Sequence, residues 1–188
     1  MAGERFFTIA EPLPSLRVLE RQPVGDERGT LERLYDADGL DGVLEVTRVA
    51  QVNRTLTAAR GTLRGMHFQR EPYAEIKIVH CVRGAVFDVA IDVRPESATF
   101  LRWHGEVLSA QNKRFLRIPE GFAHGFQTLE DDCEMIYVHS QPYRPDFEAG
   151  IHPCDPALGI AWPIEIMLLS DRDTGHPPIN DRFIGVSP

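Results

Sequence analysis

Two of the seven histidines lie in segments that suit a functional site rather than a packed core. His67 lies in LRGMHFQ and His124 in IPEGFAHGF, and glycines in both segments permit a tight turn or a close approach of backbone. An imidazole can act as a base near neutral pH, because its ordinary pKa is about 6.5. We therefore expect a functional role for both, and surface or hydrogen-bonded structural roles for the remaining histidines: His80, His104, His139, His152 and His176.

Lysine is rare in this chain, so the setting of each lysine is informative. The 20 basic residues are all Arg apart from Lys77 and Lys113, and Lys113 falls in the turn-like segment QNKR. Lys77 lies in EIKIVHC, where the alternation of a strand would put it on the same face as Val79 and Cys81 and opposite to Ile78. It is either an edge-strand charge that discourages further pairing, or an ammonium group inside a barrel that would stabilise a developing anion.

The elements that must hold these residues are predicted to be short β-strands. Prolines and glycines divide the chain into short pieces, many of them apolar or alternating, with polar turns between them. Strands are predicted within residues 43–60 and at 75–81, 85–93, 103–108, 114–118, 123–129 and 134–140. The pattern predicts an all-β jelly roll, built as a barrel or an antiparallel sandwich. Helix is expected to be minor, over residues 30–37 and in a piece near the C-terminus.

Composition and charge limit the classes of function. The 188 residues are 43% hydrophobic and 26% charged, which predicts one globular domain over residues 1–188. We expect its core at about 43–145, with N-terminal strands and a C-terminal extension packing on it. A net charge of −8 argues against nucleic-acid and anionic-membrane partners, although local arginines can still hold a small anion. The three cysteines form no CxxC pair, and no apolar stretch approaches the ~20 residues of a membrane span, so a cytoplasmic protein is expected.

Residues 119–124 fit the pattern PxGxxH and resemble the second sequence motif of the cupin superfamily. A metal-binding cupin would carry HxH followed by Glu in its first motif. Here His67 is followed by Gln69, and Glu75 is distant, so these side chains make a poor divalent-metal site. We therefore expect a cupin-type barrel that uses no metal and no other cofactor, and whose chemistry comes from its side chains.

A narrower resemblance is carried by segments that occur in one order along the chain: GDERG, QVN, LRGMHFQ, EIKIVHCVRGAVFDVAIDVR, SATF, LSAQNKR, IPEGFAHGFQTL, EMIYVHSQPYRPDFEAG, GIAWP and SDRD. Together they resemble the dTDP-4-dehydrorhamnose 3,5-epimerase family, a branch of the cupins. The family reaction inverts stereocentres beside the C4 ketone of a dTDP-4-keto-6-deoxyhexose, in deoxysugar biosynthesis. Such a reaction needs a base, a stabiliser for the enolate oxygen, and an acid on the opposite face of the sugar.

The resemblance implies a catalytic role for four residues. His67 matches the base, and Asp173 matches the carboxylate that orients it. Lys77 matches the group that stabilises the enolate oxygen. Tyr137 matches the general acid, since a phenol with a pKa of about 10 is protonated at neutral pH. Without the resemblance, Asp173 would be interpreted as a turn residue and Tyr137 as core packing.

The resemblance also implies a nucleotide-sugar substrate and the residues that bind it. Tyr143 matches the residue that stacks on thymine, and Arg28 and Arg64 suit the diphosphate, because a guanidinium group can bond two phosphate oxygens at once. Further polar contacts are expected from Gln51, Asn53, His124, Glu148 and Arg172. The family typically forms dimers that exchange N-terminal strands, so a homodimer is expected.

The match departs from the family near the N-terminus, and several alternatives stay open. After GDERG the chain continues as TLER, QVN carries Val52 where an acidic residue is common, and Arg54 follows. These differences leave open the nucleotide base, the sugar, and whether C3, C5 or both are epimerised. Other candidates are a 3,4-ketoisomerase of related nucleotide sugars, a metal-dependent cupin that uses His67 and His124, and a sugar-binding module without turnover.

Overall fold

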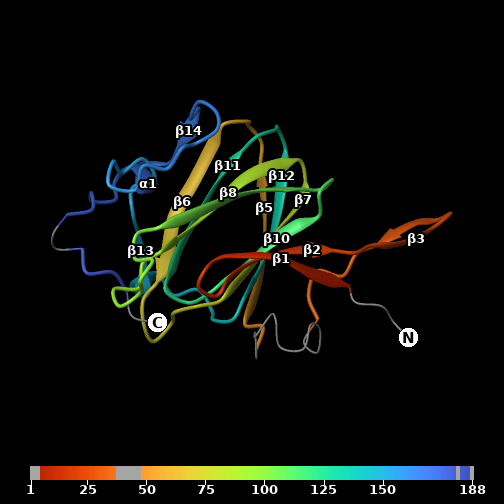
Figure 1. Cartoon of the computed structure of the whole chain (residues 1–188). Coiled ribbons are helices and arrows are strands. Elements are labelled where there is room, and N and C mark those ends of the chain that lie inside the picture. The colour runs from red at the N-terminus through yellow and green to blue at the C-terminus, as the bar shows by residue number, and fades with distance from the viewer. Residues whose placement is uncertain (1–4, 37–47, 181–182, 187–188) are drawn as a thin grey trace.

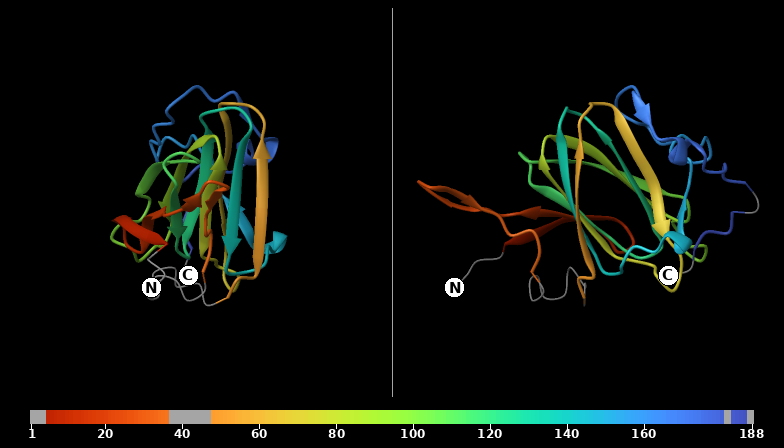
Figure 2. Two further views of the ribbon diagram at one scale, coloured as in Figure 1. Left: turned by 90° about the vertical axis from the view of Figure 1, so that its right-hand side faces the viewer. Right: turned by 180° about the vertical axis from the view of Figure 1, so that it is seen from behind.

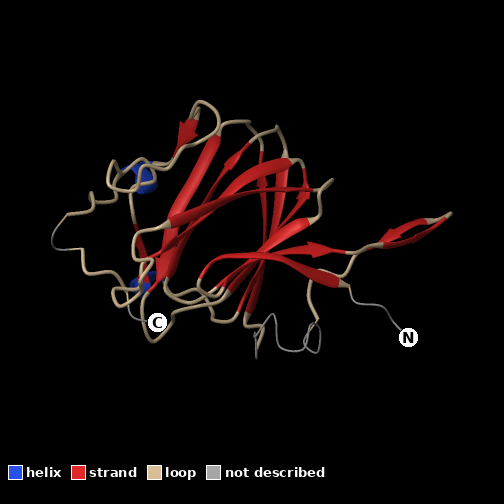
Figure 3. Cartoon of the chain, viewed as in Figure 1, coloured by secondary structure: helices blue, strands red, loops and turns tan. Residues whose placement is uncertain are grey.

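A computed structural model describes residues 5–36, 48–180 and 183–186. Its regular structure is mostly β-strand, in two antiparallel sheets that face each other (Figure 1 and Figure 3). In spatial order, the first sheet consists of β1 (Phe6–Leu13), β2 (Leu16–Arg21), β10 (Arg114–Ile118), β7 (Lys77–Arg83), β12 (Cys133–His139) and β5 (Gln51–Thr57). This architecture confirms the predicted all-β sandwich.

The second sheet carries the C-terminal part of the chain along one edge. Its order is β13 (Glu148–Gly150), β6 (Thr62–Gln69), β11 (Phe122–Thr128), β8 (Ala85–Asp92) and β9 (Trp103–Ser109). The short strand β14 (Leu168–Leu169) pairs with β6 in the parallel direction and leads to the helix α1 (Asp171–Thr174). A single 3-10 turn, Pro145–Phe147, precedes β13. The predicted C-terminal helical piece is therefore one turn of helix beside β6 (Figure 1).

Side-chain alternation along the strands builds the core between the two sheets. On β7, Val79 and Cys81 are fully buried in a cluster that includes Leu116 and Tyr137. Ile78 lies on the opposite face of β7, in a second cluster with residues of β1, β2 and β10. The predicted alternation of EIKIVHC is therefore confirmed, and it places Lys77 on the same face as the residues that fill the space between the sheets.

The other face of the second sheet is covered by the C-terminal segment. Val89 and Ile91 on β8 pack there with Met66 on β6, and Trp162 and Val186 of the C-terminal segment cover them. Burying each such side chain contributes about 1.5–3 kcal/mol. This packing fixes the chain that follows β13 against β6 and so brings α1 to the end of the barrel.

The helix predicted for residues 30–37 is wrong over its described part. Residues 24–31 form the hairpin of β3 (Val24–Asp26) and β4 (Gly29–Leu31), and residues 32–36 have no regular structure. Gly29 has a φ of +132°, which suits a tight turn rather than a helix entry. Glu32 bonds to Arg21 and Lys113 instead of starting a helix.

Several strands were missed or only partly predicted. β1 and β2 lie in a proline-containing N-terminal segment for which no strand bounds were predicted, and their residues Phe6 and Leu19 are buried. In the predicted stretch 43–60, residues 43–47 lie outside the described residues and the strand runs from Gln51 to Thr57. The β3–β4 hairpin projects away from the sandwich (Figure 2). Among the described residues, no helix combines the length and apolar character of a membrane crossing.

Candidate active site

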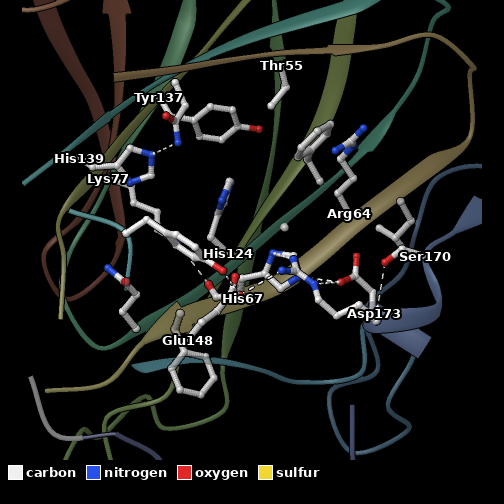
Figure 4. A pocket seen from close by; sticks show the side chains of 18 of the residues that line it. Thr55, Arg64, His67, Lys77, His124, Tyr137, His139, Glu148, Ser170 and Asp173 are labelled. Carbon is white, nitrogen blue, oxygen red and sulfur yellow. Dashed lines mark hydrogen bonds and ion pairs between the residues drawn. The ribbon is translucent and has the colours of Figure 1, made fainter. Parts of the chain in front are cut away.

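A cavity of about 750 Å³ opens between the two sheets, and side chains of both sheets line it. β5, β7 and β12 supply one wall, β6 and β11 supply the other, and the segment that carries β14 and α1 closes one side. Ten of the twelve residues predicted from the sequence line this cavity: Asn53, Arg64, His67, Lys77, His124, Tyr137, Tyr143, Glu148, Arg172 and Asp173. Residues far apart in the chain are thus brought together at one place (Figure 4).

His67 and Asp173 form a close pair at the end of β6. The distance from His67 Nε2 to Asp173 Oδ1 is 2.7 Å, and Asp173 is almost completely buried. Ser170 caps α1 by accepting a hydrogen bond from the Asp173 backbone, which fixes this residue in the first helical turn. The Gly65 backbone N–H also donates to Asp173 Oδ2, at 3.2 Å.

Electrostatics keep the Asp173 carboxylate ionised. Burial by itself would raise its pKa, but the hydrogen bond and charge of His67 and the donated N–H of Gly65 outweigh burial and hold the pKa well below its ordinary value. An ionised acceptor at Nε2 places the proton of a neutral His67 on that nitrogen. The lone pair of the neutral ring is then on Nδ1, and Arg172 Nη2 lies 3.3 Å from it.

Lys77 is an interior cation and not an edge-strand charge. β7 lies between β10 and β12, so both of its edges are paired. The Lys77 side chain is only 10% exposed, and its Nζ lies 3.3 Å from Glu75 Oε1 and 3.4 Å from the carbonyl oxygen of His67. The ammonium group therefore faces the cavity with one carboxylate partner.

Glu75 links Lys77 to a further histidine. Its other oxygen accepts a hydrogen bond from His139 Nδ1 at 2.8 Å. Burial would raise the pKa of Glu75, but the charges and hydrogen bonds of Lys77 and His139 lower it below its ordinary value. The carboxylate therefore stays negative and balances the buried ammonium, which limits the desolvation cost of holding a cation here.

Tyr137 reaches the cavity from the wall opposite to His67. It lies on β12 of the first sheet, whereas His67 lies on β6 of the second. Burial, and after it the negative charge of Asp88, raises the pKa of the Tyr137 phenol. The phenol therefore stays protonated at neutral pH, and Figure 4 shows it on a different side of His124 from Asp173.

His124 is held by a buried carboxylate that the sequence did not reveal. Its Nε2 lies 2.9 Å from both carboxylate oxygens of Asp88, which is fully buried on β8. Burial raises the pKa of Asp88 against the opposing effect of His124. His124 and His67 are cross-strand neighbours on β11 and β6, yet each ring is bonded to a different carboxylate. This arrangement is unlike a pair of histidines that share one metal ion.

The outer part of the cavity holds the predicted nucleotide-binding residues. The Tyr143 hydroxyl donates to Glu148 Oε2 at 2.8 Å, and Arg172 Nη1 donates to the same oxygen at 3.0 Å. Gln51 is not a lining residue, but its side chain accepts a hydrogen bond from the Tyr143 backbone and donates to Asn53. Arg64 lines the cavity and is exposed.

Arg28 is the one predicted residue that lies well outside this group. It sits in the turn of the projecting β3–β4 hairpin, with a side chain that is 86% exposed and paired with Asp26. No lining residue of the cavity comes from this hairpin. Within one chain, the structure therefore does not bring Arg28 to the other predicted residues.

Sequence reasoning missed several residues of the site. Glu75 and His139 line the cavity, as do Thr55 and Ser170. The spacing of Glu75 and Lys77 on one strand face was an available signal. His176 was interpreted as a structural residue, but its ring lies edge-on to His67 with the ring centroids 5.9 Å apart. Nothing in its flexible-looking sequence context, GHPP, indicated that contact.

Known proteins are similar to this chain over most of its length. The family description dTDP-4-dehydrorhamnose 3,5-epimerase matches residues 10–181. An enzyme of that name from Shigella flexneri is 43% identical over 166 residues, which cover 88% of this chain and 91% of the relative.

Solved structures of epimerases are also similar to this chain. A 3,5-epimerase from Legionella pneumophila Philadelphia 1, in complex with dTDP-4-keto-L-rhamnose, has a TM-score of 0.89 and 35% identity and covers 97% of this chain and 99% of its own. A 3'-monoepimerase from Streptomyces bikiniensis, in complex with dTDP-quinovose, has a TM-score of 0.79 and 35% identity, with coverage of 89% and 85%. The all-β sandwich, the cavity between its sheets and these similarities together show that the chain belongs to the dTDP-4-dehydrorhamnose 3,5-epimerase family of dTDP-sugar isomerases.

Proposed function

We propose that this chain epimerises C3 and C5 of a dTDP-linked 4-keto-6-deoxyhexose in deoxysugar biosynthesis. The observation that carries the proposal is the placement of a histidine–aspartate pair and a protonated phenol on opposite walls of one cavity, with a buried ammonium group between the sheets. A reaction that removes a proton from one face of a carbon and returns one to the other face needs this arrangement.

The first half of the reaction is proton abstraction. Nδ1 of His67 takes the proton from a carbon beside the C4 ketone, and Asp173 stabilises the imidazolium that results. The electron pair of the broken C–H bond forms a C=C bond, and the carbonyl π electrons move to O4. The Lys77 ammonium stabilises the enolate oxygen, and the low exposure of this group strengthens that interaction.

The second half returns a proton to the opposite face. The enolate electrons reform the ketone, and the carbon takes the hydroxyl proton of Tyr137. The phenolate and the imidazolium then exchange protons with water. Because C3 and C5 both flank C4, the same three groups serve both centres after the sugar ring shifts or turns in the cavity.

Recognition of the nucleotide involves the outer residues. Tyr143 is 48% exposed and offers its ring face for stacking on thymine. Arg64 and Arg172 are exposed cations near the diphosphate position, which explains how a chain of net charge −8 binds a dianion. Arg28 joins them when the projecting hairpin reaches the cavity of a second copy, and this forms part of the proposal that the protein is a homodimer.

Product analysis tests the proposal. The protein is incubated with dTDP-4-keto-6-deoxyglucose, the product is reduced to a stable sugar, and its configuration is assigned by NMR. Inversion at both C3 and C5 is the expected result. Migration of the ketone from C4 to C3 would identify a 3,4-ketoisomerase, and binding without any change would identify a non-catalytic sugar-binding module.

A mono-epimerase is the second candidate, because the similar structure from Streptomyces bikiniensis is named a 3'-monoepimerase. Inversion at C3 alone in the same assay would select it. Both candidates use the same base, enolate stabiliser and acid, so they differ only in whether the substrate is repositioned before release.

A further inference from the structure

The ring of His176 lies beside His67, the proposed catalytic base, and offers a nitrogen that can bind a metal ion. One nitrogen or oxygen from each of His67, Asp173 and His176 lies within 4.8 Å of the others. Among the described residues, no other group of at least three His, Cys, Asp or Glu side chains lies close enough together to hold one metal ion. His67 comes from β6, whereas Asp173 and His176 come from the segment around α1, so the group spans the junction of the sheet and the C-terminal segment.

The His176 ring packs against Gly150, at a position where a larger residue would collide with it. The His176 ring lies directly over Gly150 on β13, where an added Cβ would be 2.1 Å from His176 Nε2. That Nε2 is buried and has no hydrogen-bond partner among the described residues. A buried imidazole nitrogen without a partner is costly unless something else bonds the ring.

We propose that His67, Asp173 and His176 bind a divalent transition-metal ion, of which Zn²⁺ is the best match, and that this ion switches off the proposed base. Two imidazoles and one carboxylate are preferred ligands of Zn²⁺, with a water molecule in the fourth position. Bonds of 2.0–2.2 Å place tetrahedral ligand atoms about 3.3 Å apart. His67 Nε2 and Asp173 Oδ1, 2.7 Å apart, would have to separate slightly, whereas the His176 nitrogen, within 4.8 Å of the other ligand atoms, would have to approach them by up to about 1.5 Å.

This site differs from the metal position of a metal-binding cupin. Its ligands do not include His124, which is held by Asp88. An ion here would also disable the base: metal on His67 Nε2 leaves the ring proton on Nδ1, and metal on Nδ1 takes that lone pair, so neither mode leaves a nitrogen that can accept a proton from carbon. This consequence for activity rests on the proposed function, whereas metal binding does not.

Arg172 opposes the ion and so offers a specific test. Its Nη2 lies 2.8 Å from His67 Nε2 and its Nε lies 3.4 Å from Asp173 Oδ1, so a positive charge already occupies part of the site. The Arg172 side chain is 53% exposed and can turn toward solvent. Removing this competing cation should tighten metal binding, and a purely structural role for His176 would give no such effect.

Calorimetric titration of the intact protein with ZnCl₂ tests binding. A Cys154→Ser background is used because that thiol is exposed and can itself bind zinc. One ion per chain is expected, with affinity reduced at least about 10-fold in His176→Ala, because loss of a direct ligand should cost no less than loss of an outer partner. His104→Ala, which removes a histidine from β9, should bind like the parent.

Two further variants distinguish a metal site at His67, Asp173 and His176 from a general effect of removing one histidine. Gly150→Ala keeps His176 but displaces its ring, because the added Cβ would overlap it, so this variant should bind zinc more weakly. Arg172→Ala should bind zinc more tightly. Nitrogen NMR of the histidine rings should show zinc-dependent shifts for His67 and His176 together. No binding by the parent, equal binding by His176→Ala, or unchanged binding by Arg172→Ala would each overturn the proposal.

The effect on activity is measured separately. Zinc should inhibit the parent and chelator should restore it, while His176→Ala should need at least about 10-fold more zinc for the same inhibition. If the protein has no epimerase activity, the titration and NMR still decide whether the metal site exists. Failure of the metal site and failure of the proposed function are therefore distinguishable.

Discussion

Replacing Asp173 with asparagine tests the histidine–aspartate pair, which is the contact on which the proposed mechanism depends most. The carboxylate accepts the His67 Nε2–H at 2.7 Å, and the Asp173 side chain is only 4% exposed, so little water can reach this position to replace it. A hydrogen bond to a charged group contributes about 1.5–3 kcal/mol. Its loss while an imidazolium forms should therefore lower kcat by about 10- to 150-fold, since each 1.36 kcal/mol is tenfold in rate.

The amide adds a second effect in the same direction. Asparagine can present its NH₂ group to His67 Nε2, and this would stabilise the tautomer that carries its proton on Nδ1. The nitrogen proposed as the base would then have no lone pair facing the substrate. The expected loss is consequently at the upper end of the range or beyond it, with little change in KM because Asp173 does not bind the nucleotide.

The assay is the initial rate of product formation, measured by NMR with saturating dTDP-4-keto-6-deoxyglucose. Asp171→Asn is the matched control, because Asp171 lies in the same helical turn but is exposed. Circular dichroism and thermal melting establish that both variants are folded. A folded Asp173→Asn variant with kcat within threefold of the parent would refute the reasoning, because the pair would then have no part in proton abstraction.

Four further predictions concern the same site. Lys77→Arg should fold normally but lose most of its turnover, since a planar guanidinium cannot take the place of a compact ammonium next to Glu75; near-normal kcat would contradict this. Tyr137→Phe should lower epimerisation by about 10²–10⁴-fold, while deuterium from solvent still enters the substrate with retained configuration. Loss of both epimerisation and deuterium incorporation would show that the phenol is also needed for proton abstraction. Arg28→Ala should raise KM with little change in kcat if the hairpin reaches a partner's cavity, and chromatography with light scattering should show a dimer; an unchanged KM would remove Arg28 from the binding site. Folding depresses the pKa of Asp173, so its stabilising contribution is present above the unfolded pKa of about 3.8 and is lost as the pH falls below that value. Between pH 5 and pH 3, denaturant titrations should therefore show a smaller loss of folding free energy for Asp173→Asn than for the parent.

Four strands of the site, β5, β7, β11 and β12, could be predicted because each has a local signal. The alternation of EIKIVHC gave the face of Lys77, and the structure gives the same face. The helix expected at residues 30–37 failed because Gly29 closes a hairpin and Glu32 is held by distant cations. Local propensity carries no information about those tertiary contacts.

The pairings within the site depend on contacts between distant parts of the chain. His67 and Asp173 are 106 residues apart, and only the family resemblance indicated that they meet. Asp88 beneath His124 and His176 beside His67 had no signal in the sequence, because each depends on which strands become neighbours. Arg28 shows the converse case, since the resemblance assigns it to the site whereas one chain alone leaves it exposed on a hairpin.

Solvent exchange at the sugar carbons measures proton abstraction by His67 without relying on the later steps. The protein is incubated with dTDP-4-keto-6-deoxyglucose in deuterium oxide, and deuterium at C3 and C5 is followed by NMR beside a folded His67→Ala control. Fast incorporation at both carbons is expected with the parent, and only background exchange is expected with the control. Exchange that is equally slow with both proteins, or equally fast with both, would contradict the claim that His67 is the base that abstracts these protons.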